Sequence, residues 1–71
     1  MILTDAGPLI ALLDRGDPDH ASCVRALDLV SLPLVTTWPA FTEAMYLLGA
    51  STGYDGHAAL WELMESGRLE I

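Results

Sequence analysis

The run Leu34-Val35-Thr36-Thr37 constrains the fold of this chain more than any other stretch. It is short, rich in β-branched residues and free of charge. This pattern is typical of a strand that is covered on both faces, as strands are in parallel sheets. Because parallel strands are joined by crossover connections that are usually helices, the run predicts a sheet with helices packed on its faces.

Strand and helix patterns alternate along the rest of the chain. Gly7-Pro8 is expected to open a helix, because proline suits the first helical position. Asp17 is a good N-cap, and Gly67 suits the position just after a helix end. We therefore expect strands at residues 2–4, 34–37 and 69–71, helices at residues 7–13, 18–29, 38–48 and 54–66, and a break at residues 49–53. The predicted fold class is α/β, with a parallel three-stranded sheet and flanking helices in the order β-α-α-β-α-α-β.

Apolar stripes on the expected helices predict which side chains are buried. In the helix at 38–48 apolar residues cover nearly the whole circumference, which is typical of a buried helix. Trp38 is expected in the core or an interface, whereas His20 and His57 lie near helix starts and are expected in solvent. The other side chains assigned to apolar helix faces are Leu9, Ile10, Leu12, Leu13, Cys23, Val24, Leu27, Val30, Phe41, Ala44, Met45, Leu48, Leu60, Trp61, Leu63 and Met64.

Length and hydropathy indicate a small domain with surplus apolar surface. A chain of 71 residues is at most one domain, and a domain near this size buries only about 60% of the surface that its unfolded chain exposes. Apolar residues make up 52% of the composition and the mean hydropathy is +0.39, which is high for a small domain. We therefore expect part of the apolar surface to face a partner or further chain.

The charge of the chain argues against a generic nucleic-acid binder. Ten acids stand against three arginines and no lysine, for a net charge of −7, whereas such binders neutralise phosphates with clustered basic residues. Contact with nucleic acid would then need a metal ion, further chain or an assembled oligomer. An acidic surface also suits a basic protein partner.

The sequence has no membrane-spanning run, no signal peptide and no set of four zinc ligands. No apolar run approaches the roughly 18 to 20 residues that would span a membrane, and the N-terminus lacks the basic flank of a signal peptide. The single cysteine, Cys23, agrees with a reducing compartment, so we expect a cytoplasmic protein. His20 and Cys23 provide two ligands, whereas a structural zinc ion needs four.

Two acids follow the first two expected strands. Asp5 comes directly after residues 2–4, and Glu43, the only charged residue between Leu29 and Tyr54, lies early in the helix after residues 34–37. In parallel sheets ligands gather at the carboxyl ends of the strands, so both carboxylates are expected on one rim. Two close carboxylates repel unless a cation holds both in the ionised form, and oxygen ligands favour Mg²⁺ or Mn²⁺. The pattern predicts a metal site formed by Asp5 and Glu43.

Structural roles for the same residues remain open at this point. Asp5 is also a suitable turn or cap residue for the helix that follows. Glu43 also suits the first turns of a helix, where the dipole favours an acid. The threonines of this region are expected to favour strands or to form local backbone hydrogen bonds, and they are Thr4, Thr36, Thr37 and Thr42.

Three ordered segments carry a resemblance to a known family. Residues 2–14, then 17–20, then 34–37 leading to Thr42-Glu43 resemble the first half of a PIN domain of the VapC toxin type, and the match covers essentially all 71 residues. The resemblance implies a metal-dependent endoribonuclease of a toxin–antitoxin module, with RNA as substrate and an antitoxin protein as partner. It also implies that Asp5 and Glu43 are catalytic residues that bind Mg²⁺ or Mn²⁺.

The chain departs from this family in length. Residues 1–71 are expected to form a single PIN-like domain without its C-terminal half, which in the family supplies further aspartates. The later acids of this chain are expected on a solvated face, and they are Asp55, Glu62, Glu65 and Glu70. We therefore expect the 71-residue chain to have little or no activity. The alternatives are a non-catalytic remnant or a small protein-interaction module.

The resemblance also implies an exposed first strand. In the PIN arrangement this strand lies centrally, between the second strand and one from the later half, so here residues 2–4 would form an edge. This edge is apolar and has no lysine or proline to prevent pairing with another chain. We therefore expect a homodimer or higher oligomer through this side, or aggregation, with Ile2, Leu3, Leu9 and Leu13 contributing.

Overall fold

Three short parallel strands form the centre of the fold. The computed structural model describes residues 2–30 and 32–71, and its strands are β1 (Ile2–Leu3), β2 (Leu34–Val35) and β3 (Leu69–Glu70). The order is β1-β2-β3, with Ile2 opposite Leu34 and Leu34 opposite Leu69. The predicted α/β class with a three-stranded parallel sheet is confirmed. Each strand is shorter than expected, and β1 and β2 are each followed within a few residues by a helix.

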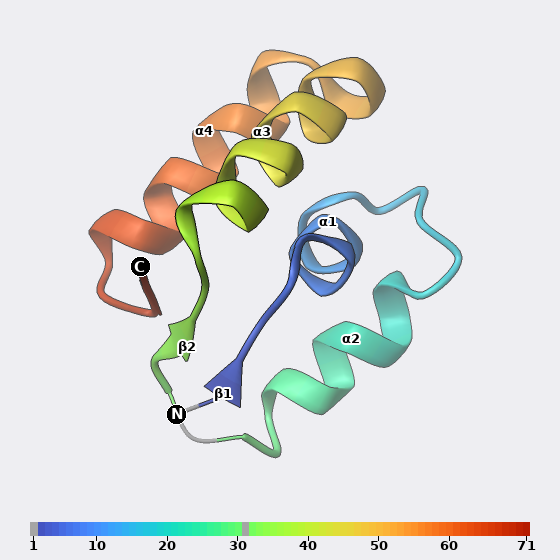
Figure 1. Ribbon diagram of the computed structural model, residues 1–71. Coiled ribbons are helices and arrows are strands. Elements are labelled where there is room, and N and C mark those ends of the chain that lie inside the picture. Colours follow the sequence, from blue (N-terminus) through green and yellow to red (C-terminus); the bar gives the residue numbers. More distant parts are fainter. Residues whose placement is uncertain (1, 31) are drawn as a thin grey trace.

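Four helices surround this sheet within the described residues. They are α1 (Ala6–Leu13), α2 (His20–Leu27), α3 (Trp38–Thr52) and α4 (Tyr54–Glu65). Figure 1 shows α3 and α4 side by side and antiparallel, while α1 packs against both of them and also against α2. In residues 2–30 and 32–71 no helix is long and apolar enough to cross a membrane.

Helix α3 runs through the break that was expected at residues 49–53. It continues to Thr52, and the chain reverses at Gly53, where φ is +67°. A helical glycine costs only about 1 kcal/mol, so Gly49 does not end the helix. A Cβ at Gly49 would lie 2.5 Å from Nε2 of His57, so glycine here allows α4 to approach α3 closely. After α4 the expected glycine cap is confirmed, since Gly67 has φ +81°.

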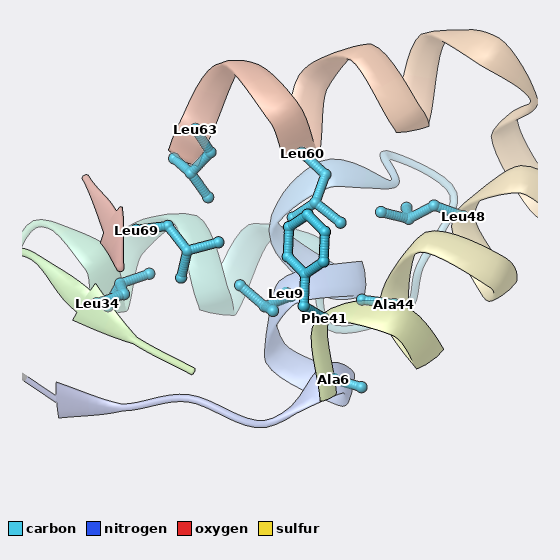
Figure 2. Close-up of a cluster of buried hydrophobic side chains, with 9 residues drawn as sticks. All are labelled: Ala6, Leu9, Leu34, Phe41, Ala44, Leu48, Leu60, Leu63 and Leu69. Atoms are coloured by element: carbon cyan, nitrogen blue, oxygen red, sulfur yellow. The ribbon is translucent and has the colours of Figure 1, made fainter. Parts of the chain in front are cut away.

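The core lies where α1, α3 and α4 meet the sheet. Figure 2 shows its nine buried side chains, which are Ala6, Leu9, Leu34, Phe41, Ala44, Leu48, Leu60, Leu63 and Leu69. Phe41 makes edge contacts with two tryptophans, at ring-centroid distances of 5.9 Å to Trp38 and 5.4 Å to Trp61. The apolar stripe predicted for α3 is therefore confirmed where it faces α1 and α4.

Other burial predictions were wrong. Helix α2 contributes no fully buried residue, and Val24 is 42% exposed, because α2 packs on α1 and not across the sheet. Helix α3 is not buried all round, since α1 and α4 cover only part of it and leave Tyr46 75% exposed. Trp38 is 62% exposed and Trp61 is 45% exposed, so neither lies in the core, and the alternative of an interface stays a prediction.

The two histidines join helices, which contradicts their predicted place in solvent. His20 donates through Nδ1 to the Ala11 carbonyl oxygen at 2.7 Å, and His57 donates through Nε2 to the Met45 carbonyl oxygen at 2.7 Å. Each side chain is half-buried. Their partners are backbone atoms 9 and 12 residues away, so no local sequence pattern indicates these contacts.

Candidate metal centre

Asp5 stands at the carboxyl end of β1 and caps α1. Its backbone is extended, with φ −86° and ψ 177°, and its Oδ1 accepts a hydrogen bond from the Ala6 amide at 3.0 Å. The expected capping role is thus confirmed. The side chain is exposed, and hydrogen bonds among the described residues engage only Oδ1. Oδ2 is therefore available to a ligand while the cap is kept.

Glu43 lies in the second turn of α3, and its side chain is exposed. The N-cap is Thr37, whose Oγ1 accepts a hydrogen bond from the Ala40 amide at 3.3 Å, and the first turn contains no acid. Because the effect of the helix dipole falls off within the first turn, it provides little reason for an acid at this position. Capping and dipole arguments therefore do not account for Glu43.

Two alanines next in sequence to these acids belong to one buried cluster. Ala6 follows Asp5 and Ala44 follows Glu43, and they are 4% and 0% exposed. Figure 2 shows both in the cluster at the packing of α1 against α3. Asp5 is the N-cap of α1 and Glu43 lies on α3, and these two helices pack against each other.

The threonines that end β1 and β2 are buried. Thr4 is 8% exposed and donates weakly through Oγ1 to the Ile2 carbonyl oxygen at 3.3 Å, as expected for a local hydrogen-bonder. Thr36 is 3% exposed, and within the described chain its Oγ1 has no hydrogen-bond partner. A buried hydroxyl without a partner is uncommon. Of the two roles expected of Thr36, the extended-strand role fits better, since it follows β2 directly and its amide donates to the Glu70 carbonyl oxygen at 2.8 Å.

Asp5 and Glu43 are not joined by a third ligand in this part of the chain. No group of three or more His, Cys, Asp or Glu side chains that could hold a metal ion occurs in residues 2–30 and 32–71. The later acids are exposed, as expected from the sequence, and they are Asp55, Glu62, Glu65 and Glu70.

Comparison with known sequences finds a relative among the VapC ribonucleases. Ribonuclease VapC26 of Mycobacterium tuberculosis is 30% identical over 78 aligned positions, which cover 99% of this chain and 58% of the relative. No family model matches the chain.

Comparison with solved structures finds the same fold class. The crystal structure of Mycobacterium tuberculosis VapC20, a toxin that cleaves the sarcin-ricin loop, matches with a TM-score of 0.86 and 20% sequence identity. The match covers 99% of this chain and 54% of VapC20, so the chain spans a little more than half the length of both proteins. The similarities in sequence and in fold together support a partial PIN-type domain of the VapC class.

Proposed function

We propose that this chain belongs to a metal-dependent endoribonuclease, the toxin of a toxin–antitoxin module, in which Asp5 and Glu43 bind Mg²⁺ or Mn²⁺. The observation that carries the proposal is the placement of the two acids. Asp5 lies two residues after β1, Glu43 lies on the helix after the neighbouring strand β2, and the alanines beside them share one buried cluster. Ligand sites in parallel sheets lie at this end of the strands.

The chemistry of the two side chains fits such an ion. Both are exposed carboxylates, and hard oxygen ligands favour Mg²⁺ and Mn²⁺ over softer metals. The ion, when bound, would activate water for attack on a phosphodiester and stabilise the charge that develops. In this proposal Asp5 offers Oδ2 to the ion while Oδ1 keeps its bond to the Ala6 amide.

The proposal also limits what the chain can do alone. In two-metal hydrolysis of phosphodiesters, two ions stabilise the attacking oxygen and the leaving oxygen. Asp5 and Glu43 provide too few ligands for two ions. We therefore expect the 71-residue chain to bind a divalent ion and to cleave RNA little or not at all. RNA is the proposed substrate of the complete site, an antitoxin protein is a proposed partner, and the proposed location is the cytoplasm.

Calorimetric titration with Mn²⁺ and Mg²⁺ tests the metal site. We expect Asp5→Asn and Glu43→Gln each to weaken binding by about tenfold or more, which corresponds to about 1.4 kcal/mol. Glu65→Gln removes an exposed acid from the far end of α4 and is the matched control, so its affinity should equal that of the wild type. Equal affinity in all four proteins would contradict the proposed site.

An RNA cleavage assay tests the limit on activity. The purified 71-residue chain with Mg²⁺ or Mn²⁺ should leave RNA largely intact. Rapid metal-dependent cleavage that disappears in Asp5→Asn would show that the described part of the chain already holds a complete active site.

A non-catalytic interaction module is the second candidate, and one observation favours it. The side chains of β1 are largely in solvent, with Ile2 44% and Leu3 74% exposed. Apolar side chains on an unpaired strand edge favour association with another chain. A homodimer or higher oligomer formed through this edge is therefore part of the second candidate.

A further inference from the structure

Backbone hydrogen bonds fix Thr36 at the carboxyl end of the central strand. Thr36 follows β2 directly, and its amide donates to the Glu70 carbonyl oxygen at 2.8 Å. On the other side of β2, the Thr4 amide donates to the Val35 carbonyl oxygen at 2.6 Å. The parallel pairing therefore continues past the last residues of β1 and β2, toward the end of the strands where ligands gather in such sheets.

The side chain of Thr36 faces the helices. Side chains alternate along an extended strand, so Thr36 shares one face of the sheet with Leu34. Figure 2 shows Leu34 in the core cluster, to which residues of α1, α3 and α4 also belong. Leu3 and Glu70 pair with Val35, lie on the opposite face and are exposed. Thr36, at 3% exposed, is therefore enclosed between the sheet and the helix layer.

Thr36 lies close to the segments that carry both proposed ligands. Because the register of β1 and β2 continues to Thr4, that residue lies beside Thr36, and Asp5 follows it directly. Along the chain Thr36 is followed by Thr37, the N-cap of the helix that carries Glu43. The hydroxyl of Thr36 is therefore at the same end of the sheet as the candidate metal centre.

This hydroxyl lowers the stability of the fold. Within the described chain the Oγ1 of Thr36 has no hydrogen-bond partner. A buried polar group without a partner has given up its hydrogen bonds to water, whereas a valine of nearly the same shape would carry no such cost. Thr4 differs, because its hydroxyl donates to the Ile2 carbonyl oxygen. Strand formation and packing thus account for the shape of the Thr36 side chain but not for its hydroxyl.

We propose that Thr36 is a positioning residue of the candidate metal centre, and that its hydroxyl accepts a hydrogen bond from a water molecule in the shell of the bound ion. Mg²⁺ held by one or two carboxylates usually keeps several waters, and polar groups just outside the direct ligands orient a metal site. The inference rests on the proposed metal site of Asp5 and Glu43. It gives a role to a polar atom that the described chain leaves without a partner.

Calorimetric titration of the 71-residue chain with Mn²⁺ tests this role. Thr36→Val should weaken binding by about tenfold or more, which is typical for the loss of such an outer partner. Thr36→Ser keeps the hydroxyl and should bind nearly as tightly as the wild type. Thr4→Val is the matched control, because Thr4 is also buried at a strand end but its hydroxyl already has a partner. Its affinity for Mn²⁺ should equal that of the wild type.

Thermal unfolding without added metal separates a positioning role from a structural one. Thr36→Val should keep or raise the Tm, because it removes a buried hydroxyl that has no partner in the described chain. A variant that only disturbed the fold would lose both Tm and affinity. Loss of Mn²⁺ affinity with an undiminished Tm is therefore the result expected of a positioning residue.

Asp5→Asn in the same titration distinguishes failure of this inference from failure of the metal site. If Asp5→Asn weakens binding but Thr36→Val does not, the role of Thr36 is wrong and the metal site stands. The same holds if Thr4→Val weakens binding as much as Thr36→Val. If Asp5→Asn binds Mn²⁺ as the wild type does, the metal site is contradicted, and the role of Thr36 with it.

Discussion

Two substitutions at Asp5 separate its capping role from its proposed metal role. Asp5→Asn keeps an oxygen that can accept from the Ala6 amide but removes the charge, whereas Asp5→Ala removes both. Loss of an N-cap typically costs about 0.5 to 2 kcal/mol. Here the bond goes to the first helical amide, not to the second or third as in a standard cap, so we expect about 0.5 to 1 kcal/mol.

Thermal unfolding in the absence of metal measures how much the Asp5 cap stabilises the folded protein. For a domain of this size 1 kcal/mol shifts the Tm by about 4 to 8 °C, so Asp5→Ala should lower the Tm by about 2 to 8 °C. In the proposed site Asp5 and Glu43 lie close to each other, so Asp5→Asn should leave the Tm unchanged or slightly raised, because it removes one of two like charges.

Thermal unfolding with Mn²⁺ measures how much a bound ion stabilises the wild type and the two Asp5 variants. At ten times its Kd an ion that binds only the folded state stabilises it by about 1.4 kcal/mol, which raises the Tm by about 6 to 11 °C. The wild type should show this rise and both Asp5 variants should lose most of it. If Asp5→Asn keeps the full rise, or loses stability without metal as Asp5→Ala does, the assignment of two roles to Asp5 is wrong.

Three further predictions concern stability and are checked by denaturant unfolding. Leu60→Ala should cost about 2 to 5 kcal/mol because Leu60 is fully buried, while Tyr46→Ala at an exposed position should stay within about 0.5 kcal/mol; similar costs for both would contradict the described core. Gly49→Ala should destabilise the protein despite a gain of about 1 kcal/mol in helix propensity, because its Cβ would lie 2.5 Å from Nε2 of His57. His57→Ala should remove most of that penalty in the double variant, and additive effects would contradict the contact. Thr36→Val should stabilise the protein by about 1 kcal/mol, since Oγ1 of Thr36 is buried without a partner in the described chain; a loss of stability would indicate that the hydroxyl is hydrogen-bonded in solution.

Local sequence patterns were sufficient to place the elements and the two acids along the chain. The β-branched run at 34–37 and the caps at Pro8 and Gly67 predicted the parallel sheet and most helix ends, because strand period, capping and turn chemistry act over a few residues. The same reasoning placed Asp5 directly after β1 and Glu43 on the helix after β2. It left open whether Asp5 is a cap or a ligand, since both roles use the same position.

Only the tertiary structure decided which helix faces are covered. Helix α2 has an apolar stripe of Cys23, Val24 and Leu27, yet among the described elements it packs on α1 and buries no residue fully. His57 reaches a carbonyl group 12 residues away, across a close approach that Gly49 allows. Ala6 and Ala44, which stand next to Asp5 and Glu43, belong to one buried cluster although they lie far apart in sequence. Burial and contact at these positions depend on neighbours from distant parts of the chain, and periodicity within one element carries no information about them.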